Sequence, residues 1–196
     1  DTGFGGLANV YKTVKDLEQV GASAVILEDQ EFPKRCALTK KIKLLDLKNS
    51  KKRIKTAVKA AKESNNILIF ARTDALSAGS LKEAIKRAKS FRKLGADAIF
   101  ITGVNTLEEI KLIKRNLKSI PLIINITQDI KFDLVDIKKN DFKFILYSQQ
   151  LLNSYIDTTN ATLKLIKNNK NPKFKNKASD TLALLNFKKY LAIEEN

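Results

Sequence analysis

A single cysteine, Cys36, follows two basic residues in the stretch Lys34-Arg35-Cys36. Neighbouring positive charge favours the thiolate form of a cysteine, which moves protons and attacks electrophiles. The same basic side chains would attract an anionic substrate. A lone cysteine also occurs commonly as a small apolar residue in a protein core. The basic neighbours suggest a thiol that takes part in chemistry, but a single cysteine leaves both interpretations open.

Histidine is absent from the chain, so any proton transfer must use cysteine, lysine, tyrosine or carboxyl groups. Polar side chains directly follow four short apolar runs. They are Glu28 and Asp29, then Arg72, Thr73 and Asp74, then Asn125 and Thr127, then Tyr147, Ser148 and Gln149. Carboxylates prefer hard divalent cations, and arginine pairs with carboxylates through two hydrogen bonds. The pattern predicts a hydrated cation that holds an anionic substrate, although any one of these residues could simply cap a helix.

The apolar runs have the composition of strands that are buried on both faces. We expect parallel strands near 24–28, 67–72, 98–102, 122–126 and 143–147. Segments with apolar residues at helical spacing separate them, so strands and helices alternate. In such folds the carboxyl ends of the strands form the face that carries active sites. Residues 29–47 are expected to form a long, lid-like loop.

Parallel βα repeats build either a closed barrel or an open, doubly wound sheet. No G-x-G-x-x-G motif follows any of the runs, so the dinucleotide-binding form of the open sheet has no support. Five strands are too few for an eight-stranded barrel, and the chain begins at Asp1 without a methionine. If the fold is a barrel, we therefore expect an N-terminally truncated one.

Composition limits the class of protein. The 196 residues suffice for one globular domain, and one cysteine favours a reducing, cytoplasmic location. The apolar runs are too short to cross a bilayer, so we expect no membrane anchor. The net charge of +16 comes mainly from scattered lysines, which are 31 of the 37 basic residues. This distribution favours a solvated basic surface over a specific nucleic-acid or other polyanion site.

Several linked motifs, "DTGFGG", "LEDQEFPKRC", "IFARTDA" and "PLIINITQ", resemble the isocitrate lyase and phosphoenolpyruvate mutase superfamily. The likeness is to the methylisocitrate lyase and 2,3-dimethylmalate lyase type. It implies a (β/α)8 TIM-type barrel with roughly strands four to eight present, followed by C-terminal helices. It also implies a magnesium-dependent site and a homotetramer in which the last helix packs on a neighbouring subunit.

The resemblance assigns roles to the residues of the basic stretch and to two acids. Asp1 and Glu28 match acids that hold Mg²⁺ and its water shell, and Mn²⁺ is an alternative metal. Cys36 matches the residue that transfers the proton at the carbon left when a carbon–carbon bond breaks. Lys34 and Arg35 would favour its thiolate and attract substrate carboxylates.

Four further residues match substrate-binding positions. Arg72 matches the arginine that grips the 2-oxo or 2-hydroxy acid end of the substrate, and Asn125 with Thr127 matches a pocket for the second carboxylate. Gly3 fits a tight turn beside the ligand, although a turn glycine needs no ligand to explain it. These assignments predict a small anionic carboxylate as substrate.

The implied activity is cleavage of a 2-hydroxy di- or tricarboxylate to a 2-oxo acid, or a related carbonyl product, and a smaller carboxylate. Phosphoenolpyruvate mutase or another phosphonate activity is the alternative enzyme, and a basic polyanion-binding module is the non-enzyme alternative. Departures from the lyase pattern at Ala37, Leu38, Thr102 and Asn153 predict an altered second carboxylate pocket, for a smaller or less charged acid.

The expected domain layout is a partial catalytic barrel over residues 1–165 and a connector with a C-terminal helix over 166–196. Residues 167–177 read as the polar connector. Residues 179–195 have helical apolar spacing, and Ser179 is the expected N-cap. Because the first metal-motif acid would precede Asp1, we expect the 196-residue chain alone to be inactive and poorly soluble.

Overall fold

The computed structural model describes residues 1–36 and 41–194, with side chains described to residue 193. The chain divides into two compact units, Asp1–Ser148 and Gln149–Asn196. Helices and strands alternate in the first unit. Its elements are α1 (Leu7–Gln19), β1 (Ala24–Glu28), α2 (Leu47–Lys62), β2 (Leu68–Thr73), α3 (Leu81–Lys93), β3 (Ala98–Ile101), α4 (Leu107–Asn116), β4 (Leu122–Ile126), α5 (Leu134–Lys139) and β5 (Phe144–Tyr147).

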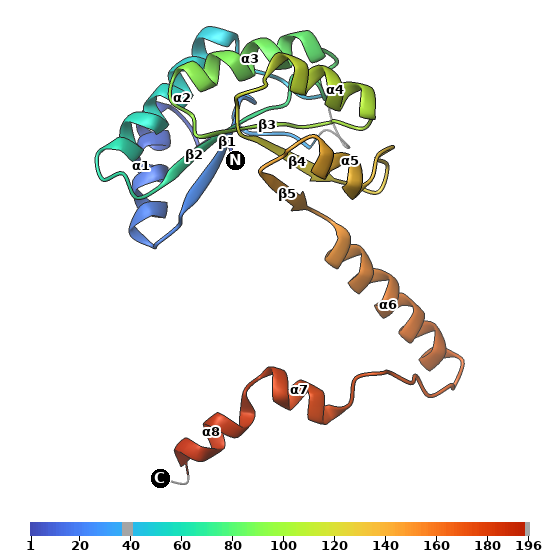
Figure 1. The fold of residues 1–196 in the computed structure, drawn as a ribbon. Helices are drawn as coiled ribbons and strands as arrows, with labels where there is room; N and C mark the ends of the chain where they lie inside the picture. The colour runs from blue at the N-terminus through green and yellow to red at the C-terminus, as the bar shows by residue number, and fades with distance from the viewer. Residues whose placement is uncertain (37–40, 195–196) are drawn as a thin grey trace. The chain divides into compact units, whose positions relative to one another are not determined.

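All five strands are parallel and lie side by side in sequence order, β1 to β5. The sheet curls into a half-barrel, and its helices lie along the outer face (Figure 1). This confirms the predicted α/β fold and the order of the strands. The predicted strand bounds are correct to within one residue because each apolar run is enclosed between charged or polar segments.

Two apolar layers hold the half-barrel together. The larger layer packs the convex face of the sheet against the helices, with Ile69, Ile99 and Ile124 among its fully buried side chains. The smaller layer lines the concave face and contains Phe70 and Phe100. Since successive strand residues point to opposite faces, the sequence alternates between the two layers.

Capping side chains fix the start of three outer helices. Asp46, Ser80 and Thr106 each accept a hydrogen bond from the backbone N–H three residues later, at α2, α3 and α4. Such caps typically contribute about 1 kcal/mol each. They hold the helix starts at the same end of the sheet as the polar residues that follow the strands.

Residues 29–46 connect β1 to α2, so the long loop expected over 29–47 ends one residue earlier, at the N-cap of α2. Its two arms pair in an antiparallel bridge between Gln30 and Leu44, with backbone hydrogen bonds from Glu31 to Lys43 (2.8 Å) and from Leu45 to Asp29 (2.9 Å). The departures at positions 37 and 38 lie outside the described residues.

The second unit consists of α6 (Gln150–Lys167), α7 (Ala178–Leu184) and α8 (Phe187–Glu194). The prediction of one helix over 179–195 capped by Ser179 is wrong. The N-cap is Lys177, and the chain leaves the helical path at Asn186, whose φ is 51°. The boundary predicted near residue 165 falls within α6, which belongs to this unit by its contacts.

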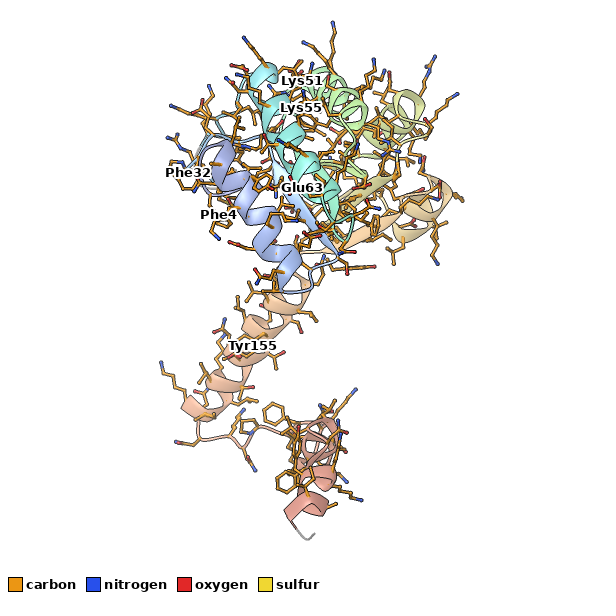
Figure 2. All side chains as sticks on the ribbon, turned by 90° about the vertical axis from the view of Figure 1, so that its left-hand side faces the viewer. Phe4, Phe32, Lys51, Lys55, Glu63 and Tyr155 are labelled. Carbon is orange, nitrogen blue, oxygen red and sulfur yellow. The ribbon has the colours of Figure 1, made fainter. Side chains whose placement is uncertain are left out.

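Many apolar side chains of the second unit are exposed, including Leu151, Tyr155, Leu184, Tyr190 and Ile193. Figure 2 shows the labelled Tyr155 projecting from α6. Among the described residues, no helix is both long enough and apolar enough to cross a membrane.

Candidate active site

The candidate site forms where β1 and β2 end. Glu28 and Arg72 are direct neighbours in the strand register, so both side chains point to the concave face. The Arg72 guanidinium carbon lies 5.6 Å from the centre of the Phe100 ring, which belongs to the concave apolar layer. A carboxylate and a guanidinium thus stand above an apolar surface, where water screens their charges less.

Two cations surround the Glu28 carboxylate, which is completely buried. Lys34 Nζ donates a hydrogen bond to Glu28 Oε2 at 3.0 Å, and Arg72 Nη1 lies 3.3 Å from the same oxygen. Lys34 Nζ also lies 3.0 Å from Oε1 and 4.0 Å from Asp1 Oδ2. The lysine ammonium therefore lies between the carboxylates of Asp1 and Glu28.

Asp74 orients the Arg72 side chain through two hydrogen bonds. Its Nε and Nη2 donate to the two Asp74 oxygens at 2.9 and 3.1 Å. Gln30 Nε2 donates to Asp74 Oδ2 at 2.5 Å, and the Thr102 hydroxyl donates to Oδ1. Burial acts to raise the pKa of Asp74, but the hydrogen bonds and charge of Arg72, with the bonds from Thr102 and Gln30, lower it overall.

The pKa of Arg72 is shifted by its burial and by its contact with Asp74. Burial acts to lower it, but the hydrogen bonds and charge of Asp74, helped by the charge of Glu28, raise it overall. Arg72 is therefore a permanent cation with a fixed orientation. Its side chain remains 26% exposed, so it is accessible to an anion.

A second buried network lies on the outer side of the same strand ends. Asp29 accepts hydrogen bonds from the Thr73 hydroxyl (2.6 Å), the Asp74 backbone N–H (3.0 Å) and Arg87 Nη1 (3.0 Å). Arg53 Nη1 donates to the Glu28 carbonyl at 2.7 Å. The network anchors the backbone on both sides of Glu28 and Asp74.

Sequence reasoning missed this supporting network, and a signal for it exists. Arg87 lies on the buried stripe of α3 with Ala84, Ala88 and Phe91, and Arg53 lies beside Ile54 on the buried stripe of α2. A charged residue on a buried stripe must meet a buried partner. Arg87 finds this partner in the Asp29 carboxylate, and Arg53 finds it in the carbonyls of Glu28 and Gln30.

The predicted catalytic stretch lies beside this cluster. Lys34 contacts Glu28, and the Arg35 backbone N–H donates to Gln30 Oε1 at 3.0 Å. Cys36 is exposed at the end of the same segment. The structure therefore brings Asp1, Glu28 and Lys34 together with Arg72, while the Arg35 and Cys36 side chains stay at the surface.

The remaining predicted residues are further apart. Gly3 has a φ of 87°, and a Cβ there would lie 2.6 Å from Val10 Cγ2, so packing against α1 explains this glycine without a ligand. Asn125 occupies β4, and Thr127 follows that strand directly. Within the described residues, no side-chain hydrogen bond joins Asn125 or Thr127 to the Arg72 cluster. The structure thus leaves their predicted role untested.

The donors at Asp1 and Glu28 fit a hydrated divalent cation. Glu28 Oε1 is buried and forms no hydrogen bond to the described residues, and the contact with Lys34 shows that the gap between the two acids favours positive charge. Mg²⁺ keeps several waters and binds through one or two carboxylates. The described residues contain no group of three or more His, Cys, Asp or Glu that could hold a metal.

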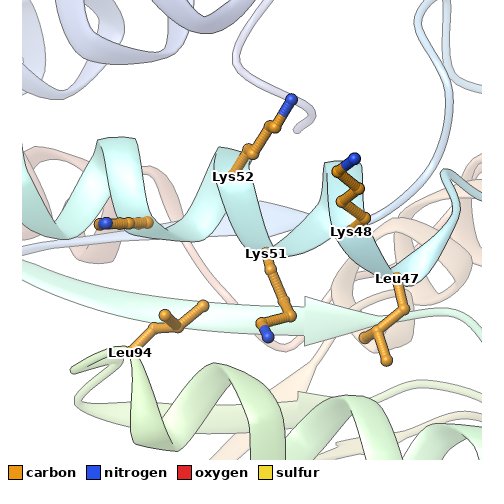
Figure 3. A pocket seen from close by; sticks show the side chains of 6 residues that line it. Leu47, Lys48, Lys51, Lys52 and Leu94 are labelled. Carbon is orange, nitrogen blue, oxygen red and sulfur yellow. The ribbon is translucent and has the colours of Figure 1, made fainter.

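A separate basic groove of about 460 Å³ lies along α2. Its lining residues are Leu47, Lys48, Lys51, Lys52, Lys55 and Leu94. In Figure 3 the side chains of Lys48 and Lys52 point to one side of the helix and that of Lys51 to the other. The ammonium groups therefore do not converge on one point, which favours a solvated surface.

Comparison with known proteins places these residues in context. The family model described as Phosphoenolpyruvate phosphomutase matches residues 1–167. Over 128 residues the chain is 39% identical to a 2-methylisocitrate lyase of Aeropyrum pernix, and the match covers 65% of this chain and 40% of that protein. Over 117 residues it is 35% identical to a 2,3-dimethylmalate lyase of Eubacterium barkeri, with 60% and 40% covered. The chain thus spans about 40% of the length of these relatives.

A solved structure of phosphonopyruvate hydrolase in complex with oxalate and Mg²⁺ has the same fold. It superposes with a TM-score of 0.83 at 25% sequence identity, and the match covers 100% of this chain and 70% of that one.

Proposed function

Because this chain belongs to the phosphoenolpyruvate phosphomutase family, we propose that the protein is a Mg²⁺-dependent carbon–carbon lyase. It would cleave a 2-hydroxy di- or tricarboxylate, of the kind named in its methylisocitrate and dimethylmalate lyase relatives. The observation that carries the proposal is the convergence of Glu28, Arg72 and Lys34 at the strand ends, with Cys36 two residues beyond Lys34.

Asp1 and Glu28 are the proposed holders of the metal, with Mn²⁺ as an alternative to Mg²⁺. When bound, the metal would supply positive charge that stabilises negative charge on a substrate oxygen. Lys34 Nζ lies between the two acids and would move aside, toward the substrate carboxylates. Its four-carbon side chain is flexible enough for this change.

Arg72 would bind the carboxylate beside the hydroxyl-bearing carbon. Its exposed nitrogens offer donors for a carboxylate, while Asp74 holds its other side. In the reaction the C2 hydroxyl would pass its proton to a general base other than Asp74, the C2–C3 bond would break, and the electron pair of that bond would pass to C3. The C2 carbon becomes the 2-oxo group, and Cys36 donates a proton to C3.

Asn125 and Thr127 are proposed to bind the second carboxylate. The Asn125 amide nitrogen and the Thr127 hydroxyl would be the donors to that carboxylate. The Asn125 side-chain oxygen, which is buried and has no hydrogen bond to the described residues, would accept from a donor group of the ligand. Thr102 is instead engaged with Asp74. We infer that the departure from the lyase pattern at Thr102 selects a smaller or less charged acid.

The alternative enzyme activity is on a phosphonate, because the oxalate- and Mg²⁺-bound neighbour is a phosphonopyruvate hydrolase. Turnover assays of the full-length protein with methylisocitrate, dimethylmalate, oxaloacetate and phosphonopyruvate separate the two. We expect cleavage of at least one of the first three, measured by release of the 2-oxo acid. Turnover of phosphonopyruvate alone would reverse the assignment.

The non-enzyme alternative is a polyanion-binding module, for which the basic groove of α2 would be the surface to test. Non-specific charge binding falls steeply with salt. We expect RNA binding in a filter assay to disappear at about 0.2 M salt. Sequence-selective binding that survives this salt would support the module instead.

We also propose that the protein forms a homo-oligomer, a tetramer, through its second unit. The exposed apolar side chains of α6, α7 and α8 support this, because large apolar surfaces commonly mark contact sites. Light scattering would test it. A monomer at micromolar concentration would contradict the proposal.

A further inference from the structure

Gln30 is a buried polar residue two positions after the end of β1, and both ends of its side-chain amide are engaged. Its Nε2 donates to Asp74 Oδ2 at 2.5 Å, and its Oε1 accepts from the Arg35 backbone N–H at 3.0 Å. Its own carbonyl accepts from Arg53 Nη1 at 2.6 Å. Gln30 is therefore fixed in place by its backbone and joins two other segments by its side chain.

The two segments that Gln30 joins have different proposed tasks. Asp74 orients Arg72, which would bind the substrate carboxylate. Arg35 precedes Cys36, which would donate the proton. One planar amide thus connects the anion-binding side of the site to the segment that carries the thiol.

We propose that Gln30 is a positioning residue that couples ligand binding at Arg72 to the placement of Cys36. The inference rests on the proposed function, because it assumes an anionic ligand on Arg72. A bound carboxylate would further restrain the guanidinium that Asp74 already orients, and the hydrogen bonds of Gln30 would pass this restraint to the Arg35 backbone.

The chemistry of the position favours an amide. Glutamate would keep an acceptor for the Arg35 N–H but would place a second carboxylate against Asp74. Methionine has a similar length but offers neither a good donor nor a good acceptor. Lys34 also links the loop to the site through Glu28, but by a long, flexible side chain rather than a bond to the loop backbone.

Because Cys36 is the single cysteine, its alkylation by iodoacetamide reports on one position. The experiment measures this rate for the full chain with and without oxalate and Mg²⁺, and measures oxalate affinity by calorimetry. We expect oxalate to slow alkylation of the wild type by about tenfold, which corresponds to about 1.4 kcal/mol, the upper range for one hydrogen bond.

Gln30→Met should bind oxalate within about threefold of wild type yet lose most of this protection, since one net hydrogen bond contributes at most about tenfold. Gln30→Glu should behave in the same way and serves if Gln30→Met does not fold by circular dichroism. Thr102→Val is the matched control. It removes another donor to Asp74 but leaves the bond between Gln30 and Arg35. With oxalate at a concentration that saturates each variant, the protection of Cys36 should persist in Thr102→Val.

Equal protection in wild type and in both Gln30 variants would overturn the inference. If the wild type does not bind oxalate, the hydrogen-bonded link between Gln30 and the Arg35 backbone is tested without the ligand. In that case alkylation without oxalate should be about fivefold faster in Gln30→Met than in wild type, since the loop has lost one hydrogen bond. Equal rates would then overturn the link between Gln30 and the Cys36 segment.

Discussion

Replacement of Arg87 by methionine would test the buried network that supports the strand ends. Arg87 is 6% exposed and its partner Asp29 is 1% exposed, with 3.0 Å between Nη1 and Oδ2. Arg87 also donates to the Ser50 hydroxyl (3.0 Å) and the Leu45 carbonyl (2.9 Å). The substitution leaves the Asp29 charge buried and without its cation. Breaking such a pair costs about 3–5 kcal/mol.

Urea denaturation followed by circular dichroism measures this free energy of unfolding. A loss below about 1 kcal/mol in Arg87→Met would refute the argument, because it would place the pair among exposed ion pairs. Glu83→Gln is the matched control. It removes the other acid partner of Arg87, which is one-third exposed, and should cost less than about 1 kcal/mol.

The double variant Asp29→Asn with Arg87→Met identifies the source of the cost. If the uncompensated Asp29 charge dominates, neutralising it should recover about 1–3 kcal/mol relative to Arg87→Met alone. The asparagine oxygen can still accept from the Asp74 N–H. A double variant less stable than Arg87→Met would show that packing, not charge, explains the loss.

Three further predictions concern the site and its turn. Arg72→Lys should weaken oxalate binding in the presence of Mg²⁺ by about tenfold or more, measured by calorimetry, because lysine cannot form the bidentate pair; unchanged affinity would remove Arg72 from the site. Gly3→Ala should lower the free energy of unfolding, measured by urea denaturation, by about 1–3 kcal/mol because its Cβ would meet Val10. Gly6→Ala, whose Cβ would have no atom within 4 Å, should be nearly neutral. Equal losses in the two variants would contradict the packing argument. The pKa of Asp74 in the folded protein is lowered from 3.8, so the stabilisation of the fold by its ionised form is complete above pH 3.8 and is lost as pH falls through the folded pKa. The difference in free energy of unfolding between wild type and Asp74→Asn should therefore shrink over that acid range. A difference independent of pH would contradict the shift.

The sheet could be predicted from the sequence because each strand is marked by a short apolar run of its own. Runs such as 67–71 are apolar throughout, and only strands buried on both faces combine that composition with so short a length. The strand order followed because consecutive βα units usually lie side by side. The C-terminal helices were harder, since the break at Asn186 depends on one backbone angle that composition does not reveal.

The candidate site was only partly predictable. The strand ends showed that Glu28 and Arg72 would share one edge, and the structure adds that they are direct neighbours in register. The roles of Gln30 and Arg87 depend on contacts between residues 44 and 58 positions apart in sequence. No local pattern specifies such pairs, although the position of Arg87 on a buried stripe indicated that it needed a partner.

The hydrogen bonds that Asp74 accepts make this carboxylate a poor general base. Both of its oxygens already accept hydrogen bonds, from Arg72, Thr102 and Gln30, and these lower its pKa. A carboxylate in this state has little affinity for a further proton. Although Asp74 lies beside the reacting end of the proposed substrate, it is unsuited to accept the C2 hydroxyl proton. The proton acceptor must be another group, and mutagenesis aimed at finding it should exclude this aspartate.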